Sequence, residues 1–210
     1  DKILECVDYW KGKSLYENLR KTLPEKINQA WDANVIDDTW VSAAGLGNVI
    51  VDYKGVVDKG LSDVMRRIEN KLKRLDPREP GNTRKRWFLE AALQGNQAVV
   101  MFSGRIADCC KEQAEQEKDE TRRRELLKLE DICRNVPLNP ARTFHEAVQS
   151  IYMILLAVHL ESNGHAISLG RFDQYVNPYY KRDLEEGRIT REEALEIVEC
   201  FFIKCNELNK

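Results

Sequence analysis

A short polar loop is the part of the sequence whose residue types best fit a binding or catalytic site. Residues 161–171 read ESNGHAISLGR and combine amide, hydroxyl and imidazole side chains with two glycines. This loop directly follows the most apolar stretch of the chain. Because a rigid scaffold positions a loop that leaves a buried helix, its polar groups can be set accurately against a ligand. The residues alone leave two interpretations open: a loop that lines a site, or one that only caps its neighbouring elements.

The histidines and cysteines form neither a metal-binding nor a disulfide pattern. The sequence has three histidines and six cysteines, and none of the cysteines are spaced as Cys-x-x-Cys. His145-Glu146 resembles the start of a zinc-protease helix, but Gln149 stands where the second histidine is required. We therefore expect no bound metal and interpret the cysteines as reduced thiols. His145 and His159 both lie in predicted helices, which favours structural roles for them.

Two basic clusters and one glycine pair suggest functions that their context argues against. Residues 84–86 and 122–124 could bind phosphate, but both runs lie on predicted helices beside glutamates, which favours a solvated charged face. Gly45-Leu46-Gly47 resembles the opening of a dinucleotide-binding loop. Strand-like sequence is lacking before it, and Ile50 stands where the third glycine is needed, so we reject that interpretation.

Helical periodicity dominates the elements that must position these residues. Apolar residues recur at three- and four-residue spacing from Val57 to Leu72, which predicts a helix there. A Ser or Thr followed three residues later by Glu forms a capping box, which marks helix starts at Ser14, Thr143 and Thr190. Convincing alternation typical of strands is lacking, so the predicted fold class is mainly α. Further helices are expected at residues 2–10, 83–118, 120–135 and 144–161.

Composition and charge exclude several classes of protein. The 33 basic and 35 acidic residues leave a net charge of −2, whereas a nucleic-acid-binding protein usually has a basic excess. The longest apolar run, Ile151–Leu160, is too short to span a bilayer, and the N-terminal residues show no signal-peptide pattern. We therefore expect no nucleic-acid partner, no membrane association and a cytoplasmic location.

The polar loop and its surroundings carry a resemblance to a known family. Residues 163–175 read NGHAISLGRFDQY, and Pro178-Tyr179-Tyr180 and the DLEEG of residues 183–187 follow. This segment closely resembles glycyl radical enzymes, and more narrowly the glycerol and diol dehydratase branch of the pyruvate formate-lyase superfamily. The similarity extends to residues 190–194 and 204–207, and upstream to residues 9–13, 51–53 and 140–147. It covers essentially the whole chain.

The resemblance implies a fold and a type of chemistry. Residues 1–210 would be a single segment of the pyruvate formate-lyase-like domain, from the helical N-terminal side of the α/β barrel of glycyl radical enzymes. In that family a radical-SAM activating enzyme installs an organic radical on a glycine, and a cysteine converted to a thiyl radical attacks a small polar substrate. The resemblance further implies a homodimer when full length. For the isolated segment, whose buried helix would lack partners, we expect exposed hydrophobic surface or self-association.

The sequence lacks the two loops that this chemistry requires. The radical glycine should lie in Arg-Val-x-Gly-Tyr, but the last glycine here is Gly187, in a predicted helix-terminating turn. The reactive cysteine should lie in Gly-Cys-x-Glu. Cys110-Lys111-Glu112 and Cys205-Asn206-Glu207 have the Cys-x-Glu spacing, but neither follows a glycine and both fall in predicted helices. We therefore expect no catalytic residue, no bound cofactor and no glycyl radical domain within the segment, which would not be competent alone.

What the resemblance leaves in this segment is part of a substrate pocket. In the dehydratase branch, a loop histidine and a second, upstream histidine bind the hydroxyls of a diol. His165 matches the first, and the upstream position falls on Asn48, 117 residues earlier. The serine that follows the loop histidine is replaced by Ala166, which removes a hydrogen-bond donor. We expect Asn48, His165 and Ala166 to contact the substrate, and we expect this substrate to be neither glycerol nor propane-1,2-diol.

Three functional interpretations remain open from the sequence. The first is a segment of a dehydratase-like glycyl radical lyase that cleaves a C–O or another C–X bond. The second is a pyruvate formate-lyase-type acyltransferase, which shares residues 168–171 and 182–184, although residues 163–165 and 172–174 favour the dehydratase branch. The third is a helical domain that binds a partner and has no catalytic function.

Overall fold

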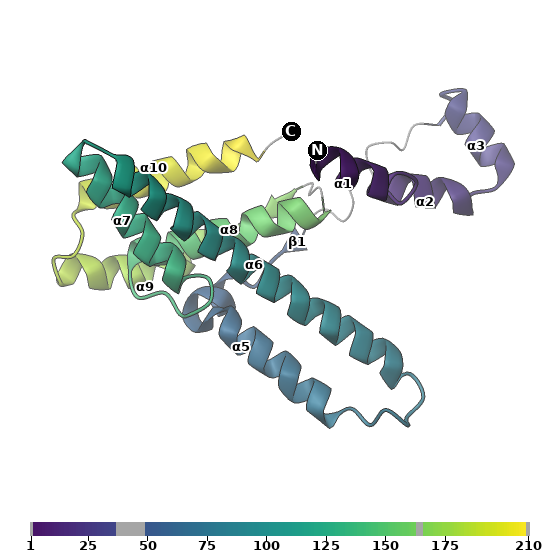
Figure 1. Cartoon of the computed structure of the whole chain (residues 1–210), viewed down its shortest axis with the longest axis horizontal. Coiled ribbons are helices and arrows are strands. Elements are labelled where there is room, and N and C mark those ends of the chain that lie inside the picture. Colours follow the sequence, from purple (N-terminus) through teal and green to yellow (C-terminus); the bar gives the residue numbers. More distant parts are fainter. Residues whose placement is uncertain (1, 37–48, 163–165, 209–210) are drawn as a thin grey trace. The chain divides into compact units, whose positions relative to one another are not determined.

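The computed structural model describes residues 2–36, 49–162 and 166–208, almost all of them in helices (Figure 1). The mainly α fold class is confirmed. Most of the expected helices are present within a few residues of their predicted bounds. In chain order the elements are α1 (Lys2–Trp10), α2 (Leu15–Thr22), α3 (Glu25–Asp32), β1 (Val49–Ile50), α5 (Tyr53–Arg74), α6 (Asn82–Gln116), α7 (Glu120–Asn135), α8 (Phe144–Ser162), β2 (Ile167–Ser168), α9 (Phe172–Glu185) and α10 (Arg191–Glu207).

The chain divides into two compact units, which are described separately. The first contains Asp1–Val49 and Val158–Ser168, and the second contains Ile50–Ala157 and Leu169–Lys210. The division passes through β1 and through α8. Strands β1 and β2, which the sequence does not predict, pair in a two-stranded sheet.

Helix caps and an ion pair organise the first unit. The capping box at the start of α2 is confirmed, because Glu17 N–H donates to Ser14 Oγ and Ser14 N–H donates to the Glu17 carboxylate. Arg20 on α2 pairs with Asp32 on α3 at 2.6 Å. Trp31 on α3 is buried, and its ring meets that of Tyr16 on α2 edge-on with centroids 5.7 Å apart. Local polar contacts therefore hold together helices that are each only two turns long.

A hairpin of two long helices and a packed apolar centre form the second unit. Helices α5 and α6 contact each other, and α6 packs along α7. Ser103 on α6 lies 2.8 Å from the carbonyl oxygen of Cys133 and 2.9 Å from that of Val136, which ties α6 to the end of α7. The most deeply buried apolar side chains come mainly from α5 and α8, and include Tyr53, Val57, Ile151 and Met153.

Two buried carboxylates join the start of α8 to the rest of this unit. Asp183 on α9 accepts a hydrogen bond from Phe144 N–H at 2.6 Å and pairs with Arg188 at 2.8 Å. Glu146 accepts hydrogen bonds from the backbone N–H and the guanidinium of Arg142. A buried carboxylate without partners would be costly, so these contacts make both acids compatible with the core.

The predicted capping box at Thr143 forms only in part. Thr143 Oγ1 accepts from Glu146 N–H at 3.2 Å, as a capping residue should. The Glu146 carboxylate, however, accepts from Arg142 N–H and not from Thr143 N–H. The prediction of a reciprocal box is wrong for this second bond, because Arg142 offers both a guanidinium and a backbone donor. The box at Thr190 with Glu193 is complete.

A glycine inside α5 allows the loop after α7 to approach the helix closely. Gly60 has φ 74° and ψ 166°, which interrupts the helical backbone. Leu61 N–H donates to Pro137 O at 2.8 Å, and Ser62 N–H donates to Leu138 O at 2.9 Å. A Cβ at residue 60 would lie 2.3 Å from Leu138 O. Only glycine suits both this backbone conformation and this contact.

We expect Gly60→Ala to lower the free energy of unfolding by roughly 3 kcal/mol or more, because the new methyl group meets backbone atoms at a positive φ. Gly104→Ala is the matched control: residue 104 lies within α6 with open space around its Cβ position, so alanine should raise stability by about 0.5–1 kcal/mol. Urea denaturation followed by circular dichroism measures both. Equal effects of the two substitutions would contradict the role assigned to Gly60.

Candidate functional site

The structure describes one of the three sequence-predicted site residues. Asn48 and His165 lie outside the described residues. Ala166 is exposed and has a φ of 55°, in the left-handed region that side chains other than glycine, asparagine and aspartate seldom adopt. Such a conformation costs about 1 kcal/mol or more and is characteristic of binding loops, where surrounding contacts enforce it. Whether Ala166 contacts a substrate stays a prediction.

A short strand begins directly after each of two predicted site positions. β1 begins at the residue after Asn48, and β2 begins at the residue after Ala166. The two strands are hydrogen-bonded to each other. The sequence does not predict this sheet because each strand has only two residues, too few for an alternating pattern to be recognised.

The chain that leaves β2 makes a tight turn at Gly170. Gly170 has φ 63°, and a Cβ there would lie 2.7 Å from Tyr175 Oη and 3.2 Å from Ile50 Cγ2. The Tyr175 hydroxyl also accepts a hydrogen bond from Arg171 N–H at 3.1 Å. Tyr175 belongs to the first turn of α9, so this helix holds the end of the loop in place. A side chain at residue 170 would displace Tyr175 and remove this constraint.

Aromatic rings fix the helices around the loop. Phe172 at the start of α9 stacks on Phe201 of α10 with ring centroids 4.8 Å apart and planes 5° apart. Tyr152 of α8 meets Phe201 edge-on at 6.5 Å. Such pairs add about 0.5–1.5 kcal/mol beyond simple burial. The three helices that precede and follow the loop are therefore linked through one ring.

A buried hydroxyl in the second unit is a polar feature that sequence analysis did not single out. Tyr53, in the first turn of α5, is 1% exposed, and its hydroxyl has no hydrogen-bond partner within the part of the chain that the structure describes. Burial, with smaller contributions from Cys205 and Tyr175, raises the pKa of Tyr53 to about 12. The hydroxyl is thus a neutral donor at physiological pH. Its position after the Asp52 helix cap was the available sequence signal.

The two cysteines with the Cys-x-Glu spacing show the properties expected of structural thiols. Cys110 lies on α6 and Cys205 on α10, so the prediction that both Cys-x-Glu pairs lie in helices is confirmed. Burial raises the pKa of both thiols, which keeps them protonated and unreactive. All six cysteines are free. Glu207, the acid of the second pair, pairs with Lys204 at 2.7 Å.

The two histidines on α8 have different surroundings. His145 Nδ1 is buried without a hydrogen-bond partner among the described residues, and burial, followed by the charge of Lys128, lowers the pKa of His145 to about 4. His159 is half-buried near the other end of α8 and has an interaction partner. Over the described residues, no three His, Cys, Asp or Glu side chains gather as metal ligands.

None of the described helices has both the length and the apolar character needed to cross a lipid bilayer.

Comparison with known proteins identifies the family. The pyruvate formate lyase-like family model matches residues 1–210. The chain belongs to the pyruvate formate lyase-like family. The resemblance to glycyl radical enzymes is thereby confirmed, since a solved glycyl radical enzyme from Archaeoglobus fulgidus is 32% identical and covers 96% of the chain, with a TM-score of 0.81.

Individual relatives cover nearly all of this chain. Isethionate sulfite-lyase from Nitratidesulfovibrio vulgaris is 37% identical over 95% of the chain and 25% of that protein. A structure concerning 1,2-propanediol dehydration in Roseburia inulinivorans is 38% identical over 99% of this chain and 25% of its own, with a TM-score of 0.90. The glycerol-bound B12-independent glycerol dehydratase from Clostridium butyricum is 32% identical, and the match covers 100% of this chain and 26% of its own, with a TM-score of 0.88. The chain spans about a quarter of the length of these relatives.

We expect Tyr53→Phe to leave the free energy of unfolding of the 210-residue chain unchanged or to raise it by up to about 1 kcal/mol, because the hydroxyl it removes has no hydrogen-bond partner among the described residues. Tyr179→Phe is the control: Tyr179 Oη lies 3.1 Å from Asp58 Oδ1 and 3.3 Å from Val57 O, and its loss should cost about 1 kcal/mol. Urea denaturation measures both variants. A cost at Tyr53 as large as that at Tyr179 would mean that the Tyr53 hydroxyl is satisfied in solution.

Acid should destabilise the chain in part through His145. Its pKa is lowered from about 6.5 to about 4 in the folded state, so the unfolded chain binds the proton more readily between these values. This contribution to stability is complete above pH 6.5 and falls by at most about 3 kcal/mol as the pH drops to 4. Comparison of unfolding free energies across this range for the unmodified chain and His145→Gln isolates the effect. Identical pH profiles would show that His145 is not buried in the neutral form.

Proposed function

We propose that these 210 residues form part of the substrate-binding wall of a glycyl radical lyase of the dehydratase type. The family match over residues 1–210 supports this proposal, as do relatives named as lyases and dehydratases. The reaction would cleave a C–O or another C–X bond of a small polar substrate. The carrying observation is the pairing of β1 with β2, because these strands start beside the positions expected to bind the substrate.

The radical chemistry would be performed by residues beyond those in this segment. The 210-residue sequence contains neither Gly-Cys-x-Glu nor Arg-Val-x-Gly-Tyr, so it offers no position for the thiyl radical or the glycyl radical. In the complete enzyme, the radical would remove a hydrogen atom from the substrate. We further propose that a radical-SAM activating enzyme installs it and that the complete protein is a cytoplasmic homodimer. The relatives, four times longer than this chain, support this division of labour.

This segment would contribute uncharged and weakly basic groups that recognise the substrate. Asn48 can offer one acceptor and two donors, and His165 a donor or an acceptor that depends on its tautomer. Ala166 offers no side-chain hydrogen bond where the family pattern has a serine. Gly170 and Tyr175 support this role indirectly, since they hold the chain immediately after β2.

The loss of the serine donor bears on the choice of substrate. A site built to bind every hydroxyl of a diol discriminates strongly against a mismatch, so replacement of one donor by a methyl group disfavours glycerol and propane-1,2-diol. Four of the similar relatives are isethionate sulfite-lyases, and another is a (2S)-3-sulfopropanediol dehydratase. We therefore propose that substrates other than simple diols, with sulfonates among the first to assay, give the highest turnover.

The test uses the complete activated enzyme that contains these residues. Asn48→Ala and His165→Ala should each lower kcat/KM roughly 10²-fold or more, because they remove hydrogen bonds to the reacting substrate. His159→Gln, on α8 six residues before His165, is the control and should change kcat/KM by no more than about threefold. The measurement is turnover against a panel of isethionate, sulfopropanediol, glycerol, propane-1,2-diol, choline and hydroxyproline.

The glycyl radical content of each variant, measured by EPR, shows whether activation is unchanged. A loss of turnover with normal radical content supports a substrate-binding role. Equal losses for all three variants would remove Asn48 and His165 from the pocket. A complete enzyme that never carries the radical would overturn the assignment to this class of lyase.

A further inference from the structure

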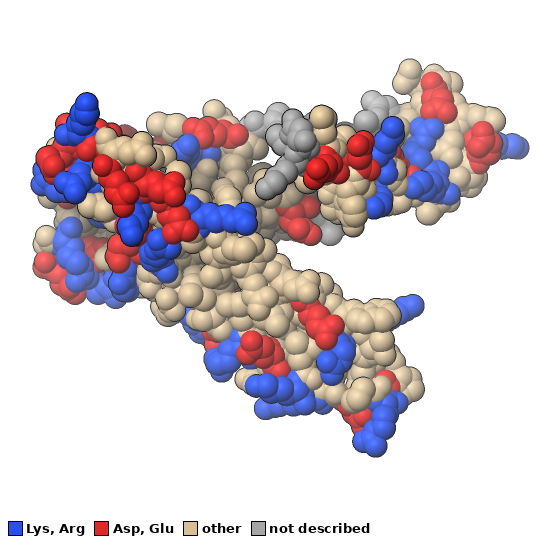
Figure 2. Space-filling model, viewed as in Figure 1, with Lys and Arg blue, Asp and Glu red and all other residues tan. Residues whose placement is uncertain are grey.

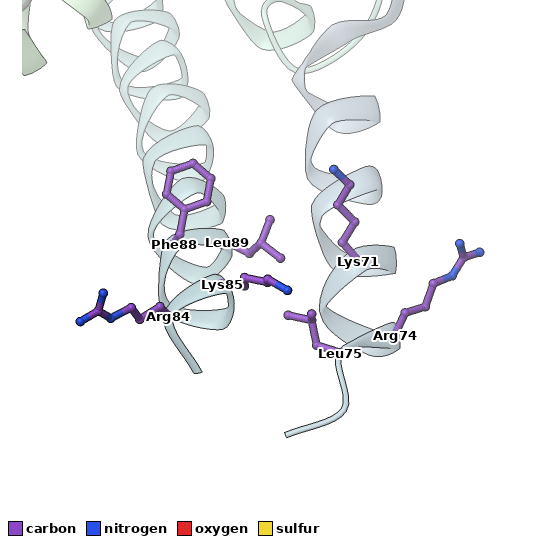
Figure 3. Close-up of a pocket in the computed structure, with 7 residues that line it drawn as sticks. All are labelled: Lys71, Arg74, Leu75, Arg84, Lys85, Phe88 and Leu89. Carbon is purple, nitrogen blue, oxygen red and sulfur yellow. The ribbon is translucent and has the colours of Figure 1, made fainter. Parts of the chain in front are cut away.

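A groove lies at the end of the α5–α6 hairpin, within the second unit, and none of the sequence-predicted site residues line it. It has a volume of about 620 Å³ and is lined by Lys71, Arg74 and Leu75 of α5 and by Arg84, Lys85, Phe88 and Leu89 of α6. In Figure 3, Leu75, Lys85 and Leu89 point into the space between the two helices, whereas Arg74 and Arg84 extend outward on either side. Two leucines therefore line the space between the helices, Lys85 projects into it, and Arg74 and Arg84 lie at its edges; these cations and Lys71 are called the rim cations.

The cations of this rim lack carboxylate partners. Nearby arginines are paired: Arg66 and Arg67 with Asp63, Arg78 with Asp76, and Arg86 with Glu90. By contrast, the four cations that line the groove form no ion pair with any described residue of the chain. Lys85 donates only to the neutral side chain of Asn82, at 3.0 Å. Like charges gathered in this way repel one another, and a bound anion would remove the repulsion.

The charge of the hairpin end differs from that of the rest of the chain. Residues 66–90 contain nine basic and four acidic residues, a net charge of +5, whereas the whole chain carries −2. Figure 2 shows Lys and Arg side chains along this arm, with fewer acidic side chains among them. The first turn of α6 holds no acidic residue to balance the positive end of the helix dipole. The local field favours an anionic partner, and only near this end.

The apolar part of the surface indicates what kind of anion fits. Phe88 is 73% exposed and the adjacent Trp87 is 63% exposed. Exposed aromatic residues beside arginines are typical of the energetic centre of a protein–protein interface. A long polyanion such as nucleic acid needs an extended basic surface, whereas the residues outside 66–90 carry a net charge of −7. A short helix would contact the basic end alone.

We propose that this groove is a docking site for an acidic amphipathic helix of a partner protein. Apolar side chains of that helix would fill the space between Leu75, Phe88 and Leu89, and its carboxylates would pair with Lys71, Arg74, Arg84 and Lys85. A groove between two helices is a common receptor for an amphipathic helix with anchors at i, i+3, i+4 and i+7. This inference does not depend on the proposed lyase function.

The exposed Arg84 and Lys85 are compatible with the solvated face expected from the sequence, and the proposed docking would give them a second role. Arg86 fits that interpretation, since it pairs with Glu90 along the helix at 3.4 Å. Arg84 and Lys85 also join two cations that are about ten residues or more away in sequence and belong to another helix. The run at residues 122–124 fits the solvated interpretation better, because Arg122 pairs with Glu125 and Arg123 with Glu120. These two runs provide a matched comparison.

The test measures binding of a fluorescein-labelled peptide of about 18 residues, long enough to form a helix, with leucines at the anchor spacing and glutamates elsewhere. Fluorescence anisotropy with the complete protein that contains these residues should give a Kd on the order of 10 μM at low salt, and weaker binding as salt is added. Arg84→Gln combined with Lys85→Gln should weaken binding at least about tenfold. Phe88→Ala should weaken it at least about fivefold without any change in charge.

Arg122→Gln combined with Arg123→Gln is the control, because it makes the same change in net charge on α7. It should change the Kd by less than about twofold, with circular dichroism confirming that all variants are folded. The absence of binding, or equal losses in both double variants, would overturn the proposal. So would an oligonucleotide that binds as tightly as the peptide and is insensitive to Phe88→Ala. A dimer that dissociates in the Arg84/Lys85 variant, seen by light scattering, would identify the occupant as a second copy and would equally overturn it.

Discussion

The arrangement around α8 depends on the hydrogen bond and the ion pair that the buried carboxylate of Asp183 makes. It lies on α9, yet it accepts a hydrogen bond from Phe144 N–H at the first residue of α8. An anion at a helix N-terminus satisfies a free backbone donor and interacts favourably with the helix dipole. Arg188 balances the charge of Asp183 from the turn that follows α9. This side chain thus links α8 to α9, the helices that precede and follow the predicted substrate loop in the chain.

A second constraint acts through the backbone at Gly60. The loop after α7 approaches α5 so closely that its carbonyl groups accept hydrogen bonds from Leu61 and Ser62. This contact uses donors that the interruption of the helix leaves free, and buried backbone donors must find such partners. It also orients the start of α5, where Asp52 caps the helix and Tyr53 enters the core. Polar backbone contacts and apolar packing therefore support each other in the second unit.

Buried polar groups that have hydrogen-bond or ion-pair partners differ in role from polar groups that lack them. Glu146 and Asp183 are buried and fully engaged with arginines and backbone donors, so they stabilise the fold. By contrast, the rim cations of the α5–α6 groove form no ion pair with a described residue, and the Tyr53 hydroxyl has no hydrogen-bond partner among the described residues. Leu160, a large apolar side chain near the end of α8, is 70% exposed. Its exposure fits the expectation of exposed hydrophobic area in a segment that spans about a quarter of the length of its relatives.

The sequence by itself determined the helices, most of their ends and the family. Periodicity and capping depend on residues three or four positions apart, so they can be read along the chain, as the boxes at Ser14 and Thr190 show. The motif around residues 163–175 was long enough to identify the family, and the resemblance implies substrate contacts for Asn48, His165 and Ala166. Only the tertiary structure decided the pairing of β1 with β2, the partners of Asp183 and Glu146, and the gathering of cations at the groove. These features join residues from different elements, and local patterns carry no information about which distant groups meet.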